Sequence, residues 1–391
     1  MRRFTQIMIA CLLVVLLTLV SVRIGTAGTA KAFSPCGSWT IIHSPNPPQT
    51  INSRLFGVAA ISSDDVWAVG SYFVNRFDTN TLIEQWNGTN WSIVPSPSPG
   101  SSTIDDELYT VAAISSNDAW AAGVQNNQPL IEHWDGQQWN VVSSPMLSTA
   151  SLFGMAAISR NDIWIVGSQI TNSALGATLI EHWNGQQWGI VASPNESSVE
   201  NRLSSVTVLS SKNVWAVGDY SNNHGIFQTL TEHWDGMQWS IVASPNTGTL
   251  DNVLNGVSAV ASSNIYAVGF YKVETQSSFY FQTLIERWNG TKWRVVPSPH
   301  PGTPGDTLDS VAAVSANNVW AVGSYSTPGT LPLIVHWNGT AWQAVSNPST
   351  APTSVLGSVT VVPGTSQLWA VGSATSAIHP HVVKTLTEFY C

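Results

Sequence analysis

Short apolar runs of about four to eight residues recur along the whole chain, and polar turn residues separate them. In one complete repeat the runs cover residues 108–114, 119–123, 130–134 and 139–142. They are rich in β-branched and aromatic residues, and no long segment has a helical period, so each run predicts a short β-strand. We name the four strands of a repeat a, b, c and d in chain order.

Tryptophan marks the same positions in every repeat. All but one of the 19 tryptophans fall in strands b, c or d, and the exception is Trp39. The b-strand aromatics are Trp67, Trp120, Trp164, Trp215, Tyr266, Trp320 and Trp369; the c-strand aromatics are Trp86, Trp134, Trp183, Trp234, Trp288, Trp337 and Tyr390; the d-strand tryptophans are Trp91, Trp139, Trp188, Trp239, Trp293 and Trp342. Repeats of about 40–55 residues with four short strands predict a β-propeller. The expected blades start near residues 55, 108, 152, 203, 254, 308 and 356.

Turn residues support this assignment. Asn-Gly or Asp-Gly joins strand c to strand d, as at Asn87-Gly88, and both dipeptides favour tight hairpins. Ser-Pro follows strand d, as at Ser96-Pro97, and proline there ends strand pairing. An Asp or Asn stands two residues before the b-strand aromatic and is expected to be a turn residue. These residues are Asp65, Asp118, Asp162, Asn213, Asn264 and Asn318.

The two ends of the chain predict how the ring closes. Strands a, b and c occur seven times, but only six d strands follow them, and the segment 36–45 around Trp39 has the pattern of the missing one. We therefore expect an all-β, single seven-bladed propeller with four antiparallel strands per blade, in which residues 36–45 supply the outer strand of blade seven. Cys36 and Cys391 would then meet where that hairpin is interrupted, which predicts a disulfide; the alternative is two free thiols.

The repeat resembles the kelch and galactose-oxidase-like propellers over the whole mature chain. Strand b ends in Gly, as in Trp67-Ala-Val-Gly70, strand c ends in an aromatic residue, and strand d opens with Trp. A single Gly stands where kelch units carry a Gly-Gly doublet. A weaker similarity links the Trp-Asn-Gly turn and following Trp to tectonin-type propeller lectins. The oxidase activity is not implied, because its copper site needs a Cys–Tyr crosslink and the mature cysteines are assigned to ring closure.

The first 32 residues predict a secretory signal peptide. Arg2 and Arg3 precede an apolar run from 7 to 22, and Ala30-Lys31-Ala32 forms a cleavage site. The alternative is an uncleaved membrane anchor, for which about 16 apolar residues is short. We expect a secreted or extracytoplasmic protein, with the cell surface included. Residues 33–391 then form one propeller domain, expected to be monomeric.

Charge narrows the set of partners. The whole chain has a formal net charge of −9, and signal-peptide removal takes away four basic residues and no acidic one. A surface this acidic disfavours nucleic acid and anionic membranes as partners. We find no nucleophile motif, phosphate loop or spaced metal ligands, so no cofactor and no metal are expected.

The links between strands point to one face of the propeller. In antiparallel blades the a–b and c–d links share one face and the b–c and d–a links share the other. The second face carries the long, divergent loops, where function on a scaffold is usually found, although the loops could also drift without constraint. The candidate contact residues there are Arg76, Asp78, Asp105, Asp106, Glu107, Glu200, Arg202, His224, Tyr271, Lys272, Glu274, Tyr280, Asp306, Asp309, His379 and His381.

Several of these residues have two interpretations. Tyr271 and Tyr280, with Phe279, could stack on a sugar or a peptide side chain, or pack over the neighbouring blade. The run 105–107 could bind Ca²⁺, but it lacks a spaced ligand loop and is favoured as a solvated acidic loop. His379 and His381 could form half of a metal site, with no third ligand evident.

A ring of charged residues in strand c is expected to be structural. Catalysis needs one asymmetric constellation, whereas these residues occur once per blade. They are Glu84, Glu132, Glu181, Glu232, Glu286 and Glu388, and Val335 takes this place in the sixth repeat. In four repeats the next residue is a histidine: His133, His182, His233 and His336. We expect the glutamates to make hydrogen bonds that hold a turn or a neighbouring strand.

The sequence favours a non-enzymatic scaffold that binds an extracellular protein or carbohydrate through its long b–c and d–a loops. An extracellular polysaccharide hydrolase or lyase with its site on the same face is the alternative. A third hypothesis is that the protein is a purely structural component of the cell surface or matrix.

Overall fold

The computed structural model describes residues 36–391 except 76–77, 100–105, 146, 148, 172–173, 277, 303–304, 328, 377 and 380. The chain divides into residues 1–34 and a compact unit, residues 35–391, which contains every strand described below. The predicted signal peptide, Arg76 and Asp105 lie outside the described residues. Within the described residues no helix is long and apolar enough to span a membrane.

Each sequence repeat forms four strands, as predicted. The a strands are β2 (Asn52–Ser62), β6 (Asp106–Ser115), β10 (Ala150–Ser159), β14 (Glu200–Ser210), β18 (Asn252–Ala261), β22 (Asp306–Ser315) and β26 (Ser354–Val361). The b strands are β3 (Asp65–Phe73), β7 (Asp118–Gln125), β11 (Asp162–Thr171), β15 (Asn213–Ser221), β19 (Asn264–Glu274), β23 (Asn318–Ser326) and β27 (Leu368–Thr375).

The remaining strands lie further from the axis. The c strands are β4 (Thr79–Trp86), β8 (Gln128–Trp134), β12 (Ala174–Trp183), β16 (Phe227–Trp234), β20 (Phe279–Trp288), β24 (Thr330–Trp337) and β28 (Val383–Tyr390). The d strands are β5 (Trp91–Ile93), β9 (Trp139–Val141), β13 (Trp188–Ile190), β17 (Trp239–Ile241), β21 (Trp293–Val295), β25 (Trp342–Val345) and β1 (Trp39–Ile42).

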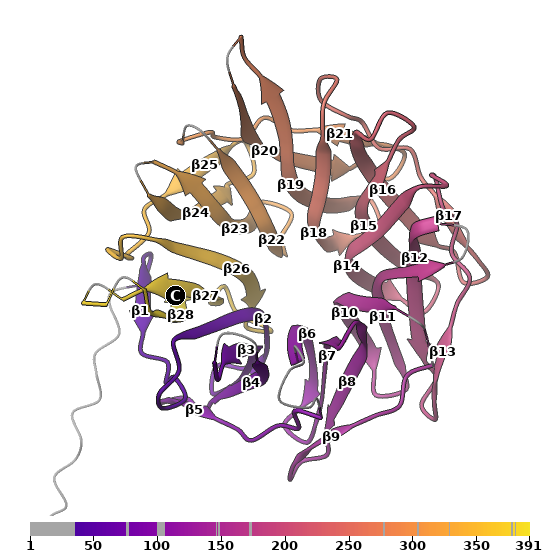
Figure 1. Cartoon of the computed structure of the whole chain (residues 1–391). Helices are drawn as coiled ribbons and strands as arrows, with labels where there is room; N and C mark the ends of the chain where they lie inside the picture. Colours follow the sequence, from indigo (N-terminus) through magenta and orange to yellow (C-terminus); the bar gives the residue numbers. More distant parts are fainter. Residues whose placement is uncertain are drawn as a thin grey trace, which may run out of the picture. The chain divides into compact units, whose positions relative to one another are not determined.

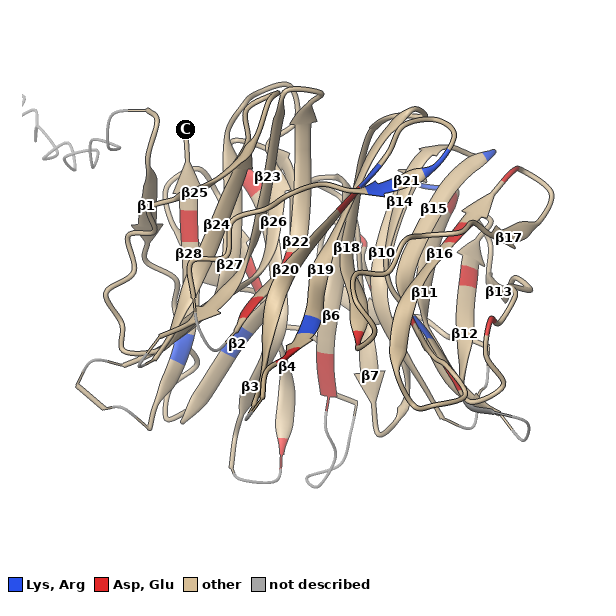
Figure 2. Ribbon diagram, turned by 90° about the horizontal axis from the view of Figure 1, so that it is seen from above, with Lys and Arg blue, Asp and Glu red and all other residues tan. Residues whose placement is uncertain are grey.

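The strands of a repeat pair antiparallel in the order a, b, c, d, as in β2-β3-β4-β5. We call the four strands of one repeat a set. Single parallel contacts join some neighbouring sets, at Asn52 with Val383 and at Gly176 with Glu200. The sets are arranged around a central axis, with the a strands innermost (Figure 1). Charged residues are sparse over the ring, and β28 contains one basic and one acidic position (Figure 2).

The links divide between two faces as the sequence predicts. Trp86 Nε1 donates a hydrogen bond of 3.1 Å to Ser63 O, which joins a c strand to an a–b link. Gly88 in the c–d link packs against Asp64, since a Cβ built there would lie 2.8 Å from the Asp64 Cβ. We call this side, formed by the a–b and c–d links, the turn face, and the side formed by the b–c and d–a links the loop face.

The N-terminal strand pairs with the C-terminal strand, which confirms the predicted closure contact. β1 runs antiparallel to β28, with Trp39 opposite Tyr390. Next to this pairing, Cys36 and Cys391 form a disulfide with a Cα–Cα distance of 4.7 Å, and Gly37 N donates to Cys391 O at 2.6 Å. The interrupted hairpin is therefore joined covalently and by a backbone hydrogen bond.

Aromatic side chains form the contacts between neighbouring sheets. Trp67 in β3 packs on Trp134 and Trp139 of the next set, with ring centroids 5.1 and 5.2 Å apart. Trp320 makes the corresponding contacts with Tyr390 at 4.5 Å and Trp39 at 5.7 Å. Trp39 thus takes the place of a d-strand tryptophan, and the b- and d-strand tryptophans are buried in the core.

Four of the six c-strand glutamates, Glu84, Glu181, Glu286 and Glu388, accept hydrogen bonds from the neighbouring sheet, in keeping with the predicted structural role. All six are fully buried. Ser44 Oγ donates to Glu84 Oε2 at 2.6 Å, and Asn347 Nδ2 donates to Glu388 Oε2 at 2.8 Å; each donor follows the d strand of the adjacent set. Burial raises the pKa of Glu181 and Glu388 to about 7 and that of the other four to about 8, so these side chains are largely protonated near pH 6.

The Asp or Asn before each b-strand aromatic has a further role beyond the expected turn. Asp118 Oδ1 accepts a hydrogen bond of 3.2 Å from Trp120 Nε1 and lies 2.9 Å from His133 Nε2. The His133 ring stacks on Trp120 with a centroid distance of 4.2 Å. Asn213 and Asn318 make the same two contacts, so these three residues at the start of their b strands fix the orientation of a tryptophan and a histidine.

Candidate functional site

Every a strand is interrupted by a β-bulge at the residue that follows its buried leucine. In β2, Leu55 pairs with Gly70 and Gly57 with Val69, so Phe56 has no partner in the ladder. A bulge re-aims the side chain of the extra residue. The equivalent residues of the ring are Phe56, Tyr109, Phe153, Ser204, Asn255, Asp309 and Gly357.

The glycine that ends each predicted b-strand run makes this bulge possible. A Cβ on Gly70 would lie 1.9 Å from Arg54 O, and the same clash recurs at Gly123 with Glu107 O. The a-strand backbone therefore approaches the b strand too closely for any side chain. Glycine inside a strand commonly signals a bulge or a close backbone approach, so this signal was present in the sequence.

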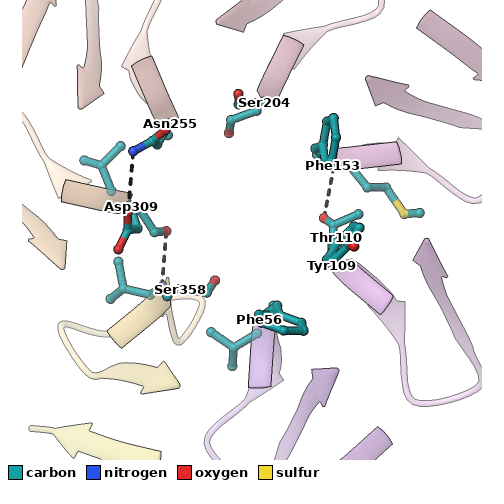
Figure 3. Close-up of a pocket in the computed structure, with 18 of the residues that line it drawn as sticks. Phe56, Tyr109, Thr110, Phe153, Ser204, Asn255, Asp309 and Ser358 are labelled. Carbon is teal, nitrogen blue, oxygen red and sulfur yellow. Dashed lines mark hydrogen bonds between the residues drawn. The ribbon is translucent and has the colours of Figure 1, made fainter. Parts of the chain in front are cut away.

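The bulged residues surround a pocket on the central axis, which we call the axial pocket (Figure 3). Its volume is about 210 Å³. Phe56, Tyr109 and Phe153 form one half of its wall. The other half is polar, with Ser204, Asn255, Asp309 and Ser358. The bulges occur near the fourth residue of each a strand, so the pocket lies toward the loop face.

Two charged residues predicted from the sequence support the aromatic half. Tyr109 OH donates a hydrogen bond of 2.6 Å to Glu107 Oε2, and Ser71 Oγ donates to Glu107 Oε1 at 3.0 Å. The Arg202 guanidinium lies 5.9 Å from the Phe153 ring centroid. These contacts hold the tyrosine ring by its hydroxyl and place a cation beside the phenylalanine.

Hydrogen bonds between neighbouring strands order the polar half. Asn255 Nδ2 donates to Leu308 O at 2.9 Å and to Asp309 Oδ1 at 3.4 Å. Ser310 Oγ accepts from Val359 N at 3.2 Å. Burial raises the pKa of the Asp309 carboxyl to about 7. Near neutral pH this group can therefore both accept and donate hydrogen bonds.

A second depression adjoins the axial pocket between β26 and β2. It has a volume of about 280 Å³ and shares Phe56 and Gly357 with the axial pocket. Arg54, Val355 and Ala374 contribute to its wall. Because Gly357 has no side chain, the ring of bulged residues is open on this side. We call this depression the side groove.

Ten of the residues expected in loops lie in strands instead, and that expectation is wrong for them. The hairpins extend toward the loop face beyond the apolar runs, because backbone pairing continues through polar residues. The ten are Asp106 and Glu107 in β6, Glu200 and Arg202 in β14, Tyr271, Lys272 and Glu274 in β19, Tyr280 in β20, and Asp306 and Asp309 in β22.

Three predicted contact residues are buried. Asp78, Asp106 and Asp306 are each less than 10% exposed. Asp306 Oδ1 accepts a hydrogen bond of 2.9 Å from Gly302 N, which fixes the preceding d–a link, and burial raises its pKa to about 6. Asp78 accepts a hydrogen bond from the Asn75 side chain in the β3–β4 link. Asp306 therefore orders the backbone of a loop and Asp78 orders a loop side chain, rather than facing solvent.

The hairpin of β19 and β20 brings three predicted residues together. Lys272 Nζ lies 4.4 Å from the Phe279 ring centroid and 3.5 Å from Asp251 Oδ2. The Tyr271 hydroxyl donates to Gln282 Oε1. Phe279 is 53% exposed, whereas Tyr271 and Tyr280 are half-buried. The hairpin therefore offers one exposed aromatic ring next to a cation.

The predicted histidines lie apart from these features. His224, His379 and His381 are exposed in b–c links, the first in the β15–β16 link and the others in the β27–β28 link. No group of three or more His, Cys, Asp or Glu in the described part of the chain is arranged to hold a metal ion. The predicted residues thus divide between the two halves of the axial pocket, the β19–β20 hairpin and separate loops.

Arg202 is held in place by a carboxylate that the sequence did not single out. Its guanidinium NH2 lies 2.7 Å from Asp219 Oδ1 and its Nε lies 3.1 Å from the same oxygen. Burial raises the pKa of Asp219, and the charge of Arg202 opposes that rise. The pair fixes a charged side chain beside the axial pocket.

No known protein-family model matches this chain, and no curated protein matches its sequence. Among solved structures it is similar to YCF48 bound to a D1 peptide, with 15% identity and a TM-score of 0.56 over 90% of this chain and 97% of that one. A polysaccharide lyase, PL25 ulvan lyase bound to -[GlcA(1-4)Rha3S]-, is 10% identical, with a TM-score of 0.55 over 86% of this chain and 94% of the other. An ancestral GH74 enzyme is 14% identical, with a TM-score of 0.51 over 88% of this chain and 47% of that protein. These similarities show that the fold is an all-β propeller.

Proposed function

We propose that this protein is a non-enzymatic extracytoplasmic module that binds a glycan or a protein segment on its loop face. The axial pocket carries this proposal. The leucine before each bulge is the same in all seven a strands, but the bulged residue changes from Phe and Tyr to Ser, Asn, Asp and Gly. Different side chains around the axis give the pocket the asymmetry that a specific ligand requires.

Exposed apolar side chains support the loop face as the contact surface. Ile51, Val74, Ile170, Phe279 and Ile378 are each at least 47% exposed, and all lie in or next to b–c or d–a links. Each of these side chains is available for contact with a ligand on the loop face. Similar propellers have been solved with a peptide and with an oligosaccharide bound, so the fold accommodates both kinds of ligand.

The alternative activity, hydrolysis or cleavage of a polysaccharide, has less support from the axial pocket. Glycoside hydrolysis uses two carboxyl groups that flank the scissile bond. Among the described residues that line the axial pocket, Asp309 supplies the one carboxyl group. Binding without bond cleavage therefore fits the lining better.

The wider assignments complete this proposal. We propose that the protein is a monomer with seven blades, which start near the residues given above. Residues 36–45 complete the last blade. We also propose a kelch-like or galactose-oxidase-like ancestry. Residues 1–32 act as an export signal, which agrees with the Cys36–Cys391 disulfide because such bonds persist in oxidising compartments. Mass spectrometry of the exported protein tests this: a mature N-terminus near Phe33 is expected, and retention of Met1 would contradict it.

A glycan array and a pull-down from extracellular protein, both with purified protein, test the binding function. Replacing Phe279 and Tyr280 with alanine is expected to weaken capture of the ligand found by the wild type. Met237→Ala on the turn face, which removes a side chain that is 86% exposed, is the matched control and should leave capture unchanged. Equal loss in both variants would contradict the loop face as the contact surface, and no capture by the wild type would overturn the binding function.

A further inference from the structure

We propose that the axial pocket binds one uncharged sugar ring, packed against Phe56, Tyr109 and Phe153 and hydrogen-bonded by Asn255 and Asp309. This inference rests on the proposed binding function and names the ligand class of its central site. A sugar ring has an apolar C–H face and a rim of hydroxyl groups. The pocket wall divides in the same way, with aromatic rings on one half and polar groups on the other (Figure 3).

The aromatic half forms a continuous surface. The ring centroids of Phe56 and Tyr109 lie 5.6 Å apart, and those of Tyr109 and Phe153 lie 5.8 Å apart. All three side chains are half-buried and belong to the lining of the pocket. Adjacent rings held by neighbouring strands lose little conformational entropy on binding, which favours contact with an apolar face of a ligand.

The polar half is arranged to serve hydroxyl groups. The Asn255 amide nitrogen is used in hydrogen bonds to Leu308 O and Asp309 Oδ1. The Asn255 amide oxygen and Asp309 Oδ2 accept no further hydrogen bond from the described residues. Ser204 and Ser358 add two hydroxyl groups to the lining. A hydroxyl group both donates and accepts, so a sugar can satisfy this mixed set.

Charge distribution disfavours ionic ligands. The lining contains no Lys, Arg or His among the described residues, so a carboxylate or sulfate would meet no counter-ion. A cation would meet one carboxyl group in the described lining, that of Asp309. The raised pKa of Asp309 shows that its position favours the neutral carboxyl group. An uncharged ligand avoids each of these costs.

The size of the pocket limits the ligand to one ring. A volume of about 210 Å³ lies below the range of about 300–1,000 Å³ for drug-sized sites. The side groove gives a continuing chain a way out, because it meets the axial pocket at Gly357. The next residue of a glycan would therefore lie between β26 and β2.

Saturation-transfer NMR with the purified protein tests the inference. The probes are neutral methyl glycosides of glucose, galactose, mannose, fucose and N-acetylglucosamine, with methyl glucuronide and choline as charged comparisons. We expect at least one neutral glycoside to bind and the charged probes to bind more weakly. Tyr109→Ala and Asp309→Ala should each lower the affinity for that glycoside by about tenfold, as expected for loss of one stacking or hydrogen-bonding contact. Tyr109→Phe, which keeps the ring, should retain binding.

A blocking variant and a surface control separate local from global effects. Gly357→Leu is expected to weaken the binding of longer oligosaccharides. The variant should fold, because a Cβ at this position would come no closer than 3.8 Å to Leu55 O. Met237→Ala, on the turn face and away from the axis, should leave glycoside binding unchanged. Near-UV circular dichroism confirms that each variant keeps its aromatic packing.

The results distinguish this inference from the function on which it rests. If the wild type captures a glycan or protein on its loop face but no neutral glycoside binds, or if Tyr109→Ala and Asp309→Ala bind as well as the wild type, the axial sugar site is overturned and the binding function stands. Preference for choline over every glycoside would overturn it in favour of a cation site. If nothing is captured in any assay, both proposals fail.

Discussion

Raising the pH from about 5.5 to about 6.5 is expected to lower the free energy of unfolding, because buried glutamic acids hold protons that the unfolded chain releases. The clearest case is Glu232, which is fully buried and whose two carboxyl oxygens make no hydrogen bond within the described residues. Burial raises its pKa from 4.5 to about 8. Its contribution to stability is therefore fully present below pH 4.5 and is lost as the pH rises toward 8.

The size of the effect follows from the number of protons rather than from the exact pKa. One proton released on unfolding corresponds to a slope of about 1.4 kcal/mol per pH unit. Glu232→Gln keeps the size of the side chain and removes the titrating group. The unfolding free energy of the variant should therefore fall less steeply with rising pH than that of the wild type, by about 1.4 kcal/mol per pH unit. Near pH 7 the variant should be more stable by up to about 3 kcal/mol. Denaturant titrations followed by tryptophan fluorescence at several pH values measure both quantities.

Two further variants control the interpretation. Glu196→Gln changes an exposed carboxyl group and should leave the slope of the wild type unchanged. Glu232→Val copies the residue that stands at the same place in β24, Val335, and should flatten the slope as Gln does. If wild type and Glu232→Gln show the same slope between pH 5.5 and 6.5, Glu232 is not protonated in the folded protein and the reasoning is refuted.

Three other changes test how the ring is held together. Cys36→Ser should lower the stability by about 2–4 kcal/mol, since the disulfide closes nearly the whole chain; an unchanged melting temperature would contradict a closing role. Trp39→Ala should cost about 3–5 kcal/mol in a denaturant titration, because Trp39 packs on Trp320, and a cost below about 1 kcal/mol would show that β1 is dispensable. Gly70→Ala should prevent accumulation of folded protein, because its Cβ would lie 1.9 Å from a backbone oxygen, whereas Gly189→Ala, with no atom within 4 Å, should fold normally.

The repeat pattern predicted the strands well because one physical signal determines both. A tryptophan at a fixed place in strands b, c and d can be buried only if neighbouring sheets stack, so the spacing of the tryptophans predicts the blade. The same spacing left Trp39 without a repeat of its own, and the structure places Trp39 against Trp320 and Tyr390. Local hydrophobic pattern and tertiary contact agree at these positions.

The contact residues were harder to predict because burial depends on where a strand ends. Asp106 and Asp306 follow polar linkers and have the composition of loop residues, but backbone pairing extends through them and buries their side chains. A change of two residues in a strand boundary moves a carboxyl group from solvent into the sheet. Asp309 was recognised as a candidate, but the loop assigned to it was wrong, since it lies within β22.

The sequence by itself determined the all-β repeat, the pairing of the first strand with the last and the Cys36–Cys391 contact, because each depends on residue spacing along the chain. Only the tertiary structure decided which side chains meet on the axis. Phe56 and Asp309 belong to strands far apart in the sequence, and a β-bulge in each turns them toward the same pocket. A bulge changes the direction of a side chain without changing the hydrophobic period around it, so the axial pocket becomes visible only when the ring is assembled.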